Sequence, residues 1–170
     1  MIMHRVRAYI TMAILFILQL TCSDLFTIAG STPHLLLVFC VCFAVMNVLS
    51  IDGFILCAIS GFLCDITGVF PWGVSSLIFM AVYVGCSLVG SKFYSAKLPI
   101  CMLFTFIVSF LYESCGYLAL VIAGTDIGYG IAIVRLILPV CVYQVILSVV
   151  LYGIMHRVLA LVSYGDSDLN

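Results

Sequence analysis

The sequence Gly61-Phe62-Leu63-Cys64-Asp65-Ile66-Thr67-Gly68 lies inside an apolar run that extends from Gly53 to Phe70. A run of this length can cross the hydrocarbon core of a bilayer as a helix. Asp65 is the charged residue in this run, and a carboxylate at membrane depth costs roughly 2.5–3.5 kcal/mol on the insertion scale. Some interaction must offset this cost, so Asp65 indicates either a functional site or a contact with a partner.

The composition of the chain is typical of a membrane protein. Of its 170 residues, 66% are hydrophobic and 8% are charged, whereas soluble domains are about 45–50% apolar and 25% charged. A soluble fold of this length could not bury so much apolar surface. We therefore expect an all-α integral membrane protein that forms a single domain over residues 1–170. The net charge of −1 gives no indication of nucleic-acid binding.

Apolar runs long enough to cross about 30 Å of hydrocarbon recur along the chain. They predict a six-helix transmembrane bundle with spans at Tyr9–Ala29, His34–Ser50, Gly53–Phe70, Trp72–Gly90, Leu98–Ala123 and Ile131–Leu151 or slightly beyond. Helix breakers such as Pro33 and Pro71 separate them. Because the second to fourth runs are short and closely spaced, a five-span count also fits. The first run has no clear cleavage site, so we interpret it as an uncleaved helix and not as a signal peptide.

The basic residues predict the orientation of the chain. They precede the first span, separate the fourth from the fifth and follow the sixth: Arg5, Arg7, Lys92, Lys97 and Arg157. In a six-span chain these three regions share one side of the membrane, whereas the opposite loops hold Asp24 and Asp126. Positive charge accumulates on the cytoplasmic side. Both termini are therefore expected in the cytoplasm.

The cysteines and histidines do not form a pattern typical of a metal site. The nine cysteines lie in the apolar runs without a Cys-x-x-Cys pair, which is typical of small packing residues. The three histidines include no i, i+4 pair that could place two ligands on one helix face. The sequence also contains no phosphate loop, no dinucleotide fingerprint and no nucleophile with a base. We therefore expect no catalysis, no metal and no cofactor.

Apart from Asp24 near the outer end of the first span, the charged residues inside the expected spans are Asp65, Glu113 and Arg135. With a rise of about 1.5 Å per residue, Asp65 and Arg135 lie about one and a half turns below the outer surface. Glu113 lies nearer mid-depth. The matched depth and opposite sign of Asp65 and Arg135 predict a salt bridge between them, or two charges that line one outward-facing cavity. Internal neutralisation, contact with a partner or ligand, and proton or ion transport all stay open as roles.

The pattern of glycines around Asp65 resembles the rod shape-determining protein MreD family. That family has a Gly-x-x-x-Asp motif, a glycine shortly after it and a glycine that opens the next helix. The motif carries over to Gly61, Asp65, Gly68 and Gly73. The leucines after Pro33 also match, although the family often has Asp or Asn where this chain has His34. The match covers roughly Pro33–Gly90.

This resemblance implies a function that the chemistry of the residues does not. Members of the MreD family are small inner-membrane proteins that act with the membrane-anchored MreC, the actin-like MreB and the wall synthases of lateral peptidoglycan growth. The implied role is a non-catalytic scaffold or regulatory subunit that binds an MreC-like partner. The candidate residues for partner contact or for intramembrane polar interactions are Asp65, Arg135, Glu113, Gly61, Gly68 and Gly73.

A second interpretation comes from a different class of protein. The MreD family is similar in overall fold to the S components of energy-coupling-factor transporters, which bind a vitamin in an outward-opening cavity. Asp65 and Arg135 at matched depth would suit such a cavity. Vitamin sites, however, need more polar and aromatic groups than the short outer loops of this chain supply. A small enzyme that acts on lipid is a third and weaker interpretation.

Overall fold

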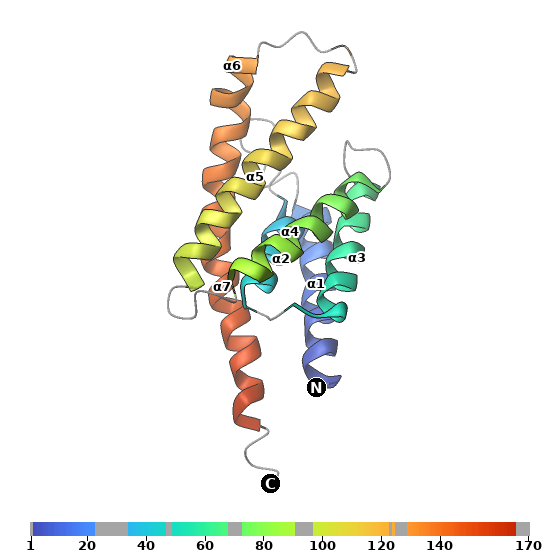
Figure 1. Cartoon of the computed structure of the whole chain (residues 1–170), viewed down its shortest axis with the longest axis vertical. Helices are drawn as coiled ribbons and strands as arrows, with labels where there is room; N and C mark the ends of the chain where they lie inside the picture. The colour runs from blue at the N-terminus through green and yellow to red at the C-terminus, as the bar shows by residue number, and fades with distance from the viewer. Residues whose placement is uncertain are drawn as a thin grey trace.

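The computed structural model describes residues 2–22, 34–46, 49–67, 73–90, 97–122, 124 and 129–165, and the regular elements in these ranges are all helices. The helices are α1 (Ile2–Cys22), α2 (Leu35–Met46), α3 (Ile51–Thr67), α4 (Val74–Gly90), α5 (Lys97–Ile122), α6 (Tyr129–Ala132), the π-helix η1 (Ile133–Ile137) and α7 (Leu138–Gly165). The last three follow one another directly and form one long helix (Figure 1). The prediction of an all-α protein is confirmed for this part of the chain.

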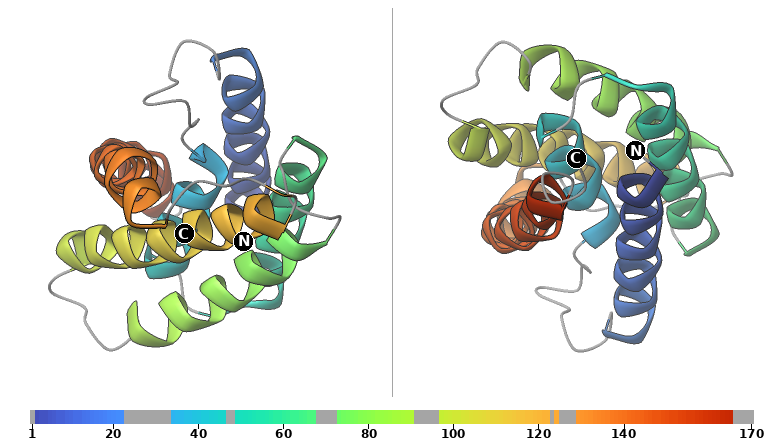
Figure 2. Two further views of the ribbon diagram at one scale, coloured as in Figure 1. Left: turned by 90° about the horizontal axis from the view of Figure 1, so that it is seen from above. Right: turned by 90° about the horizontal axis from the view of Figure 1, so that it is seen from below.

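Helix α2 lies at the centre of the bundle. Five helices, α1, α3, α4, α5 and α7, pack against it, and the end-on views of Figure 2 show them around it. Every residue from Leu35 to Val45 is buried. Because α2 has 12 residues, its length is about 18 Å, shorter than the roughly 30 Å of a hydrocarbon core. The span expected at His34–Ser50 corresponds to the shorter helix Leu35–Met46, whose side chains pack against the surrounding helices.

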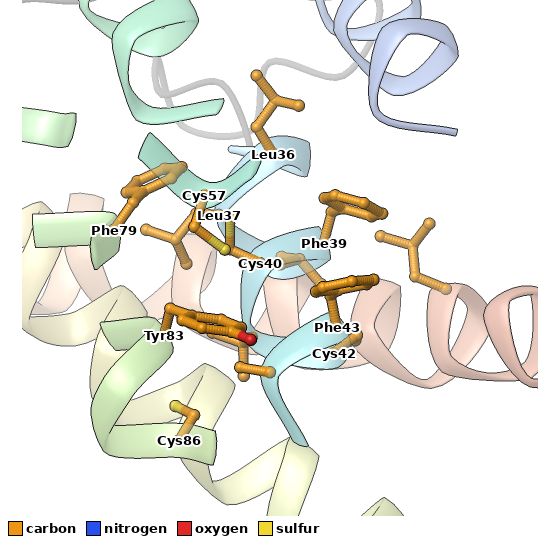
Figure 3. Packing of buried hydrophobic residues seen from close by; sticks show 14 of the residues in the cluster. Leu36, Leu37, Phe39, Cys40, Cys42, Phe43, Cys57, Phe79, Tyr83 and Cys86 are labelled. Carbon is orange, nitrogen blue, oxygen red and sulfur yellow. The ribbon is translucent and has the colours of Figure 1, made fainter. Parts of the chain in front are cut away.

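The core is built on aromatic and thiol side chains of α2 and of the helices around it (Figure 3). The rings of Phe39 and Phe43 stack with centroids 5.9 Å apart, and Phe43 in turn stacks on Tyr83 of α4 at 6.5 Å. The hydroxyl of Tyr83 accepts a hydrogen bond from the backbone N–H of Ser50 at 3.1 Å. The cysteines described in the structure are free thiols, and all but Cys115 are buried.

Large apolar side chains cover the outside of the bundle. Exposed examples occur on each of the helices around α2: Ile17, Phe62, Leu77, Leu103 and Ile146. The segments Leu98–Ala119 and Gly130–Arg157 are both long and apolar enough to cross a membrane. Three further apolar helices, Val6–Thr21, Leu35–Met46 and Val74–Gly90, are shorter. An apolar exterior of this extent is typical of a surface that faces lipid or another protein.

The expected spans agree best with α3, α4 and α5, whose bounds differ from them by a few residues. Helix α1 begins at Ile2 and not near Tyr9, and the last helix continues to Gly165, well past Leu151. Hydropathy measures the apolar length of a helix, so it misses the turns beyond its apolar part. The start of α1 and the end of α7 lie at the same end of the bundle (Figure 1). Several residues used in the sequence analysis lie outside the described ranges: Asp24, Pro33, Gly68, Pro71, Lys92 and Asp126.

Pro139 explains why the long helix changes type at η1. Proline has no backbone N–H, so Pro139 cannot donate to the carbonyl of Arg135, four residues earlier. The backbone N–H of Leu138 instead donates to the carbonyl of Ile133, five residues earlier. This is the hydrogen-bond pattern of a π-helix, and it sets the position of Arg135 within the wider turn.

Candidate functional site: a buried polar cluster

The carboxylate of Asp65 caps the first turn of α4. The backbone N–H groups of Gly73 and Ser75 donate to it at 2.7 and 2.9 Å, and that of Ser76 lies at 3.4 Å. These amides have no partner within their own helix, and the start of a helix carries partial positive charge. Asp65 is 4% exposed. The backbone of α4 therefore supplies the interaction that offsets the cost of burying this carboxylate.

Two glycines of the motif allow this contact. At Gly61, a Cβ atom would lie 2.7 Å from the carbonyl oxygen of Ser75 and would also meet the backbone of Ser76. The absence of a side chain thus lets α3 and α4 approach closely, and the Ser76 hydroxyl donates to the carbonyl of Ala58 across the same contact at 3.0 Å. Gly73 has a φ of +99°, a conformation that favours glycine. It turns the chain so that its own N–H points at Asp65.

The salt bridge expected between Asp65 and Arg135 is wrong. Asp65 is buried against the start of α4, whereas Arg135 is exposed on η1. Among the described residues, no carboxylate lies within ion-pair distance of the Arg135 guanidinium. A matched depth places both residues near the same membrane surface but does not determine which way each helix face points. The alternative, in which both charges line one outward-facing cavity, stays a prediction.

A chain of polar side chains continues from Asp65 toward α5. The hydroxyls of Ser75 and Tyr112 share a hydrogen bond at 3.0 Å. The Tyr112 ring meets the His34 ring edge to face, with centroids 4.8 Å apart and an angle of 72° between the planes. The Nε2 atom of His34 lies 3.7 Å from Oε1 of Glu113, a distance that allows an ion pair but exceeds a normal hydrogen bond. We call these five residues, Asp65, Ser75, Tyr112, His34 and Glu113, the polar cluster.

A second polar contact joins α5 to α7. The hydroxyl of Ser109 donates to Oε1 of Gln144, and both residues are fully buried. Ser109 lies one helical turn before Glu113, so it faces the same side of α5. The Nε2 atom of Gln144, Oε1 of Glu113 and the hydroxyl of Ser114 are buried without a hydrogen-bond partner among the described residues. Such groups are rare in folded proteins.

Helix α2 receives its cap from α1. The side-chain oxygen of Gln19 accepts a hydrogen bond from the backbone N–H of Leu36 at 3.1 Å. Its amide nitrogen lies 3.9 Å from the thiol of Cys64 on α3. Gln19 thus satisfies one of the free amides at the start of α2.

The side chains of the polar cluster are suited to forming hydrogen bonds and to fixing the orientation of the helices more than to covalent chemistry. No group of three or more His, Cys, Asp or Glu side chains in the described ranges could hold a metal ion. The acidic groups of the polar cluster face backbone amides or His34. The two partners of each contact lie on different helices, or one of them lies in the segment before a helix. The cluster therefore links α3, α4, α5 and the start of α2 to one another.

The structure brings together only part of the residue set expected from the sequence. Gly61, Asp65 and Gly73 meet at one turn, and Glu113 joins them through His34, Tyr112 and Ser75. Arg135 lies apart, and Gly68 lies outside the described residues.

Sequence reasoning overlooked the two glutamines, Gln19 and Gln144. The chain contains no other glutamine, and both lie in apolar runs. An amide in hydrocarbon needs a partner on another helix, so this signal could have identified them.

Comparison with known proteins gave no relative. No protein-family model, no curated protein sequence and no solved structure matches the chain.

Proposed function

We propose that the chain is an MreD-like, multi-pass protein of the bacterial inner membrane. In this proposal it is a non-catalytic scaffold or regulatory subunit of the machinery for cell elongation and lateral peptidoglycan synthesis. It binds an MreC-like membrane protein, and an MreB-like actin homologue and wall synthases belong to the same assembly. The six expected spans form one bundle that resembles the S-component fold, with both termini in the cytoplasm.

The observation that carries the proposal is the joint role of the motif residues. Gly61, Asp65 and Gly73 suggested the resemblance to the MreD family, and these three residues close one helix hairpin. A chance match of glycines and one acid within an apolar sequence would not be expected to place all three in a single contact. Their common role supports the motif as a real feature of the fold.

The apolar exterior supports a location in the membrane. Large apolar side chains face outward on α1, α3, α4, α5 and α7, while polar side chains such as Ser109 and Gln144 are fully buried. A protein with this distribution needs lipid or protein around it. The start of α1 and the end of α7 share one end of the bundle (Figure 1), which agrees with an even number of crossings.

Partner recovery after mild detergent extraction tests the proposal. The tagged full chain is purified from its own cells, and an MreC-like protein is expected in near-stoichiometric amount. An unrelated inner-membrane protein with the same tag serves as the control. Genes for MreB-like and MreC-like proteins next to the gene of this chain would give independent support. Failure to recover such a partner under conditions that keep the chain folded would contradict the proposal.

One observation favours the S-component interpretation as the second candidate. Glu113 Oε1, Ser114 Oγ and Gln144 Nε2 are buried without a hydrogen-bond partner among the described residues, and a bound small molecule could satisfy them. The same purified protein decides between the two candidates. Stoichiometric vitamin in the sample, without an MreC-like partner, would favour the transporter component.

A further inference from the structure

Arg135 is an exposed cation on the outside of a helix that is otherwise apolar. It lies in η1, within the segment Gly130–Arg157 that is long and apolar enough to cross a membrane. No carboxylate of the described residues lies within ion-pair distance of it. An unpaired guanidinium on a surface that faces hydrocarbon is costly, and an anionic group of a lipid can offset that cost.

An apolar groove lies beside Arg135 on the same helix. Its volume is about 480 Å³, and it is lined by Val134, Leu138, Pro139, Val142, Tyr143 and Ile146. Residues four apart on a helix share one face. Arg135, Pro139 and Tyr143 therefore form one row, and the neighbouring row runs from Val134 to Ile146. Arg135 thus lies at the end of the groove that is nearest to α6.

The depth of Arg135 matches the headgroup region of a bilayer. The continuous helix begins at Tyr129, six residues before Arg135, so the guanidinium lies about 9 Å along the helix from that end. A long side chain at this depth can reach the membrane surface. From Arg135 the groove continues toward the middle of the span, where acyl chains lie.

The groove residues favour a flexible chain over a packed helix. Helices that pack closely in membranes use small residues such as Gly, Ala and Ser at the contact. None of the six groove residues is small, so larger side chains, including Tyr143 and Pro139, set the outline of the groove. A lipid chain can adapt to this outline. The planar guanidinium of arginine also binds the oxygens of a phosphate in pairs.

The geometry points to a binding site for an anionic phospholipid, with its phosphate on Arg135 and one acyl chain in the groove along α7. The site requires the chain to lie in a bilayer but does not depend on a role in cell elongation. Arg135 then has a binding role in place of the internal ion pair with Asp65.

Lipid titration of the purified full chain tests this site. Phosphatidylglycerol and phosphatidylcholine are added separately to the protein in detergent, and binding is followed by native mass spectrometry and by the thermal unfolding midpoint. The wild type is expected to bind phosphatidylglycerol more tightly than phosphatidylcholine. Arg135→Gln should weaken phosphatidylglycerol binding roughly fivefold, as expected for the loss of one cation near a lipid phosphate. Arg157→Gln, at the far end of α7, is the matched control and should keep the wild-type preference.

A groove variant tests the acyl-chain part independently. Val142→Trp fills the groove without changing charge and should weaken the binding of phosphatidylglycerol as well. Equal binding of the two lipids by the wild type, or unchanged phosphatidylglycerol binding in Arg135→Gln, would overturn the inference. If Arg135→Gln instead removes an MreC-like partner while lipid binding is unchanged, the occupant is a partner helix and the lipid site is wrong. Because Arg135 is exposed, the unfolding midpoint without lipid should stay close to that of the wild type.

Discussion

The carboxylate of Asp65 lies 2.7 Å from the backbone nitrogen of Gly73 and ties the end of α3 to the start of α4. Helix caps usually come from the residue just before the helix. Here the cap comes from the preceding helix, and residues 68–72 between the two helices lie outside the described ranges. This contact joins two helices and also satisfies amides that have no acceptor within α4. Asp65 is therefore a residue on which the fold depends.

Removal of the Asp65 carboxylate should strongly destabilise the protein. Asp65→Ala leaves three amides of α4 without their acceptor, and the free energy of unfolding should fall by about 3 kcal/mol. Asp65→Asn keeps one carbonyl oxygen as acceptor and should lose less. Unfolding in mixed detergent micelles measures both values.

Arg135→Ala provides the control for Asp65. Because Arg135 is exposed and forms no ion pair with Asp65, its replacement should change the free energy of unfolding by less than about 0.5 kcal/mol. The double variant should then equal the sum of the two single variants. A clear departure from additivity would indicate that Asp65 and Arg135 interact, as the expected ion pair requires.

Gly61 and Gly85 form a matched pair for testing the close approach of α3 and α4. In Gly61→Ala the new methyl group meets the backbone of Ser75 and Ser76, so the helices must move apart at a cost of about 1–3 kcal/mol. Gly85 lies exposed on α4 with no atom within 4 Å of its Cβ position. Gly85→Ala should be neutral or stabilise the helix by up to about 1 kcal/mol. Equal effects of the two substitutions would contradict the proposed contact.

The topology can be checked with fusions to reporters that are active on one side of the membrane. With both termini in the cytoplasm, a fusion after Asn170 should report the cytoplasm and an insertion at Thr125 should report the outside. The physical reason is the placement of Arg7 and Arg157 on one side. A signal from the outer side of the membrane for the fusion after Asn170 would refute the six-span arrangement.

The sequence predicted the helices that lipid can surround better than the helix that protein covers. The bounds of α3, α4 and α5 follow the hydropathy because each helix ends near a glycine, proline or charged residue. Helix α2 has an equally apolar sequence, but its apolar side chains are buried at the centre of the bundle. Hydropathy cannot distinguish lipid from protein as the surroundings of a side chain. The length of α2 could therefore not be predicted.

Three motif residues of the candidate site were singled out from the sequence, but their contacts were not. Gly61, Asp65 and Gly73 were identified from their spacing, and the structure places them together. The partner of Asp65 was missed because it is a set of backbone amides, which have no sequence signature. His34 and Glu113 meet only because α2 and α5 pack together, and a distance of this kind between separate helices cannot be derived from spacing along one chain.

The contact between Ser109 and Gln144 gives the sharpest test of how α5 packs on α7. Gln144→Leu leaves the Ser109 hydroxyl without its acceptor, and Ser109→Ala leaves the amide of Gln144 with both polar atoms unpaired. Each single variant should lower the free energy of unfolding by about 1–3 kcal/mol, because a buried polar group loses its partner. The double variant removes both polar groups and should be less destabilised than the sum of the singles, by at least about 0.5 kcal/mol. Gln144→Leu combined with Gly85→Ala is the control and should be additive. If the pair of interest is additive as well, the two side chains do not interact, and the packing of α5 against α7 must differ from that described here.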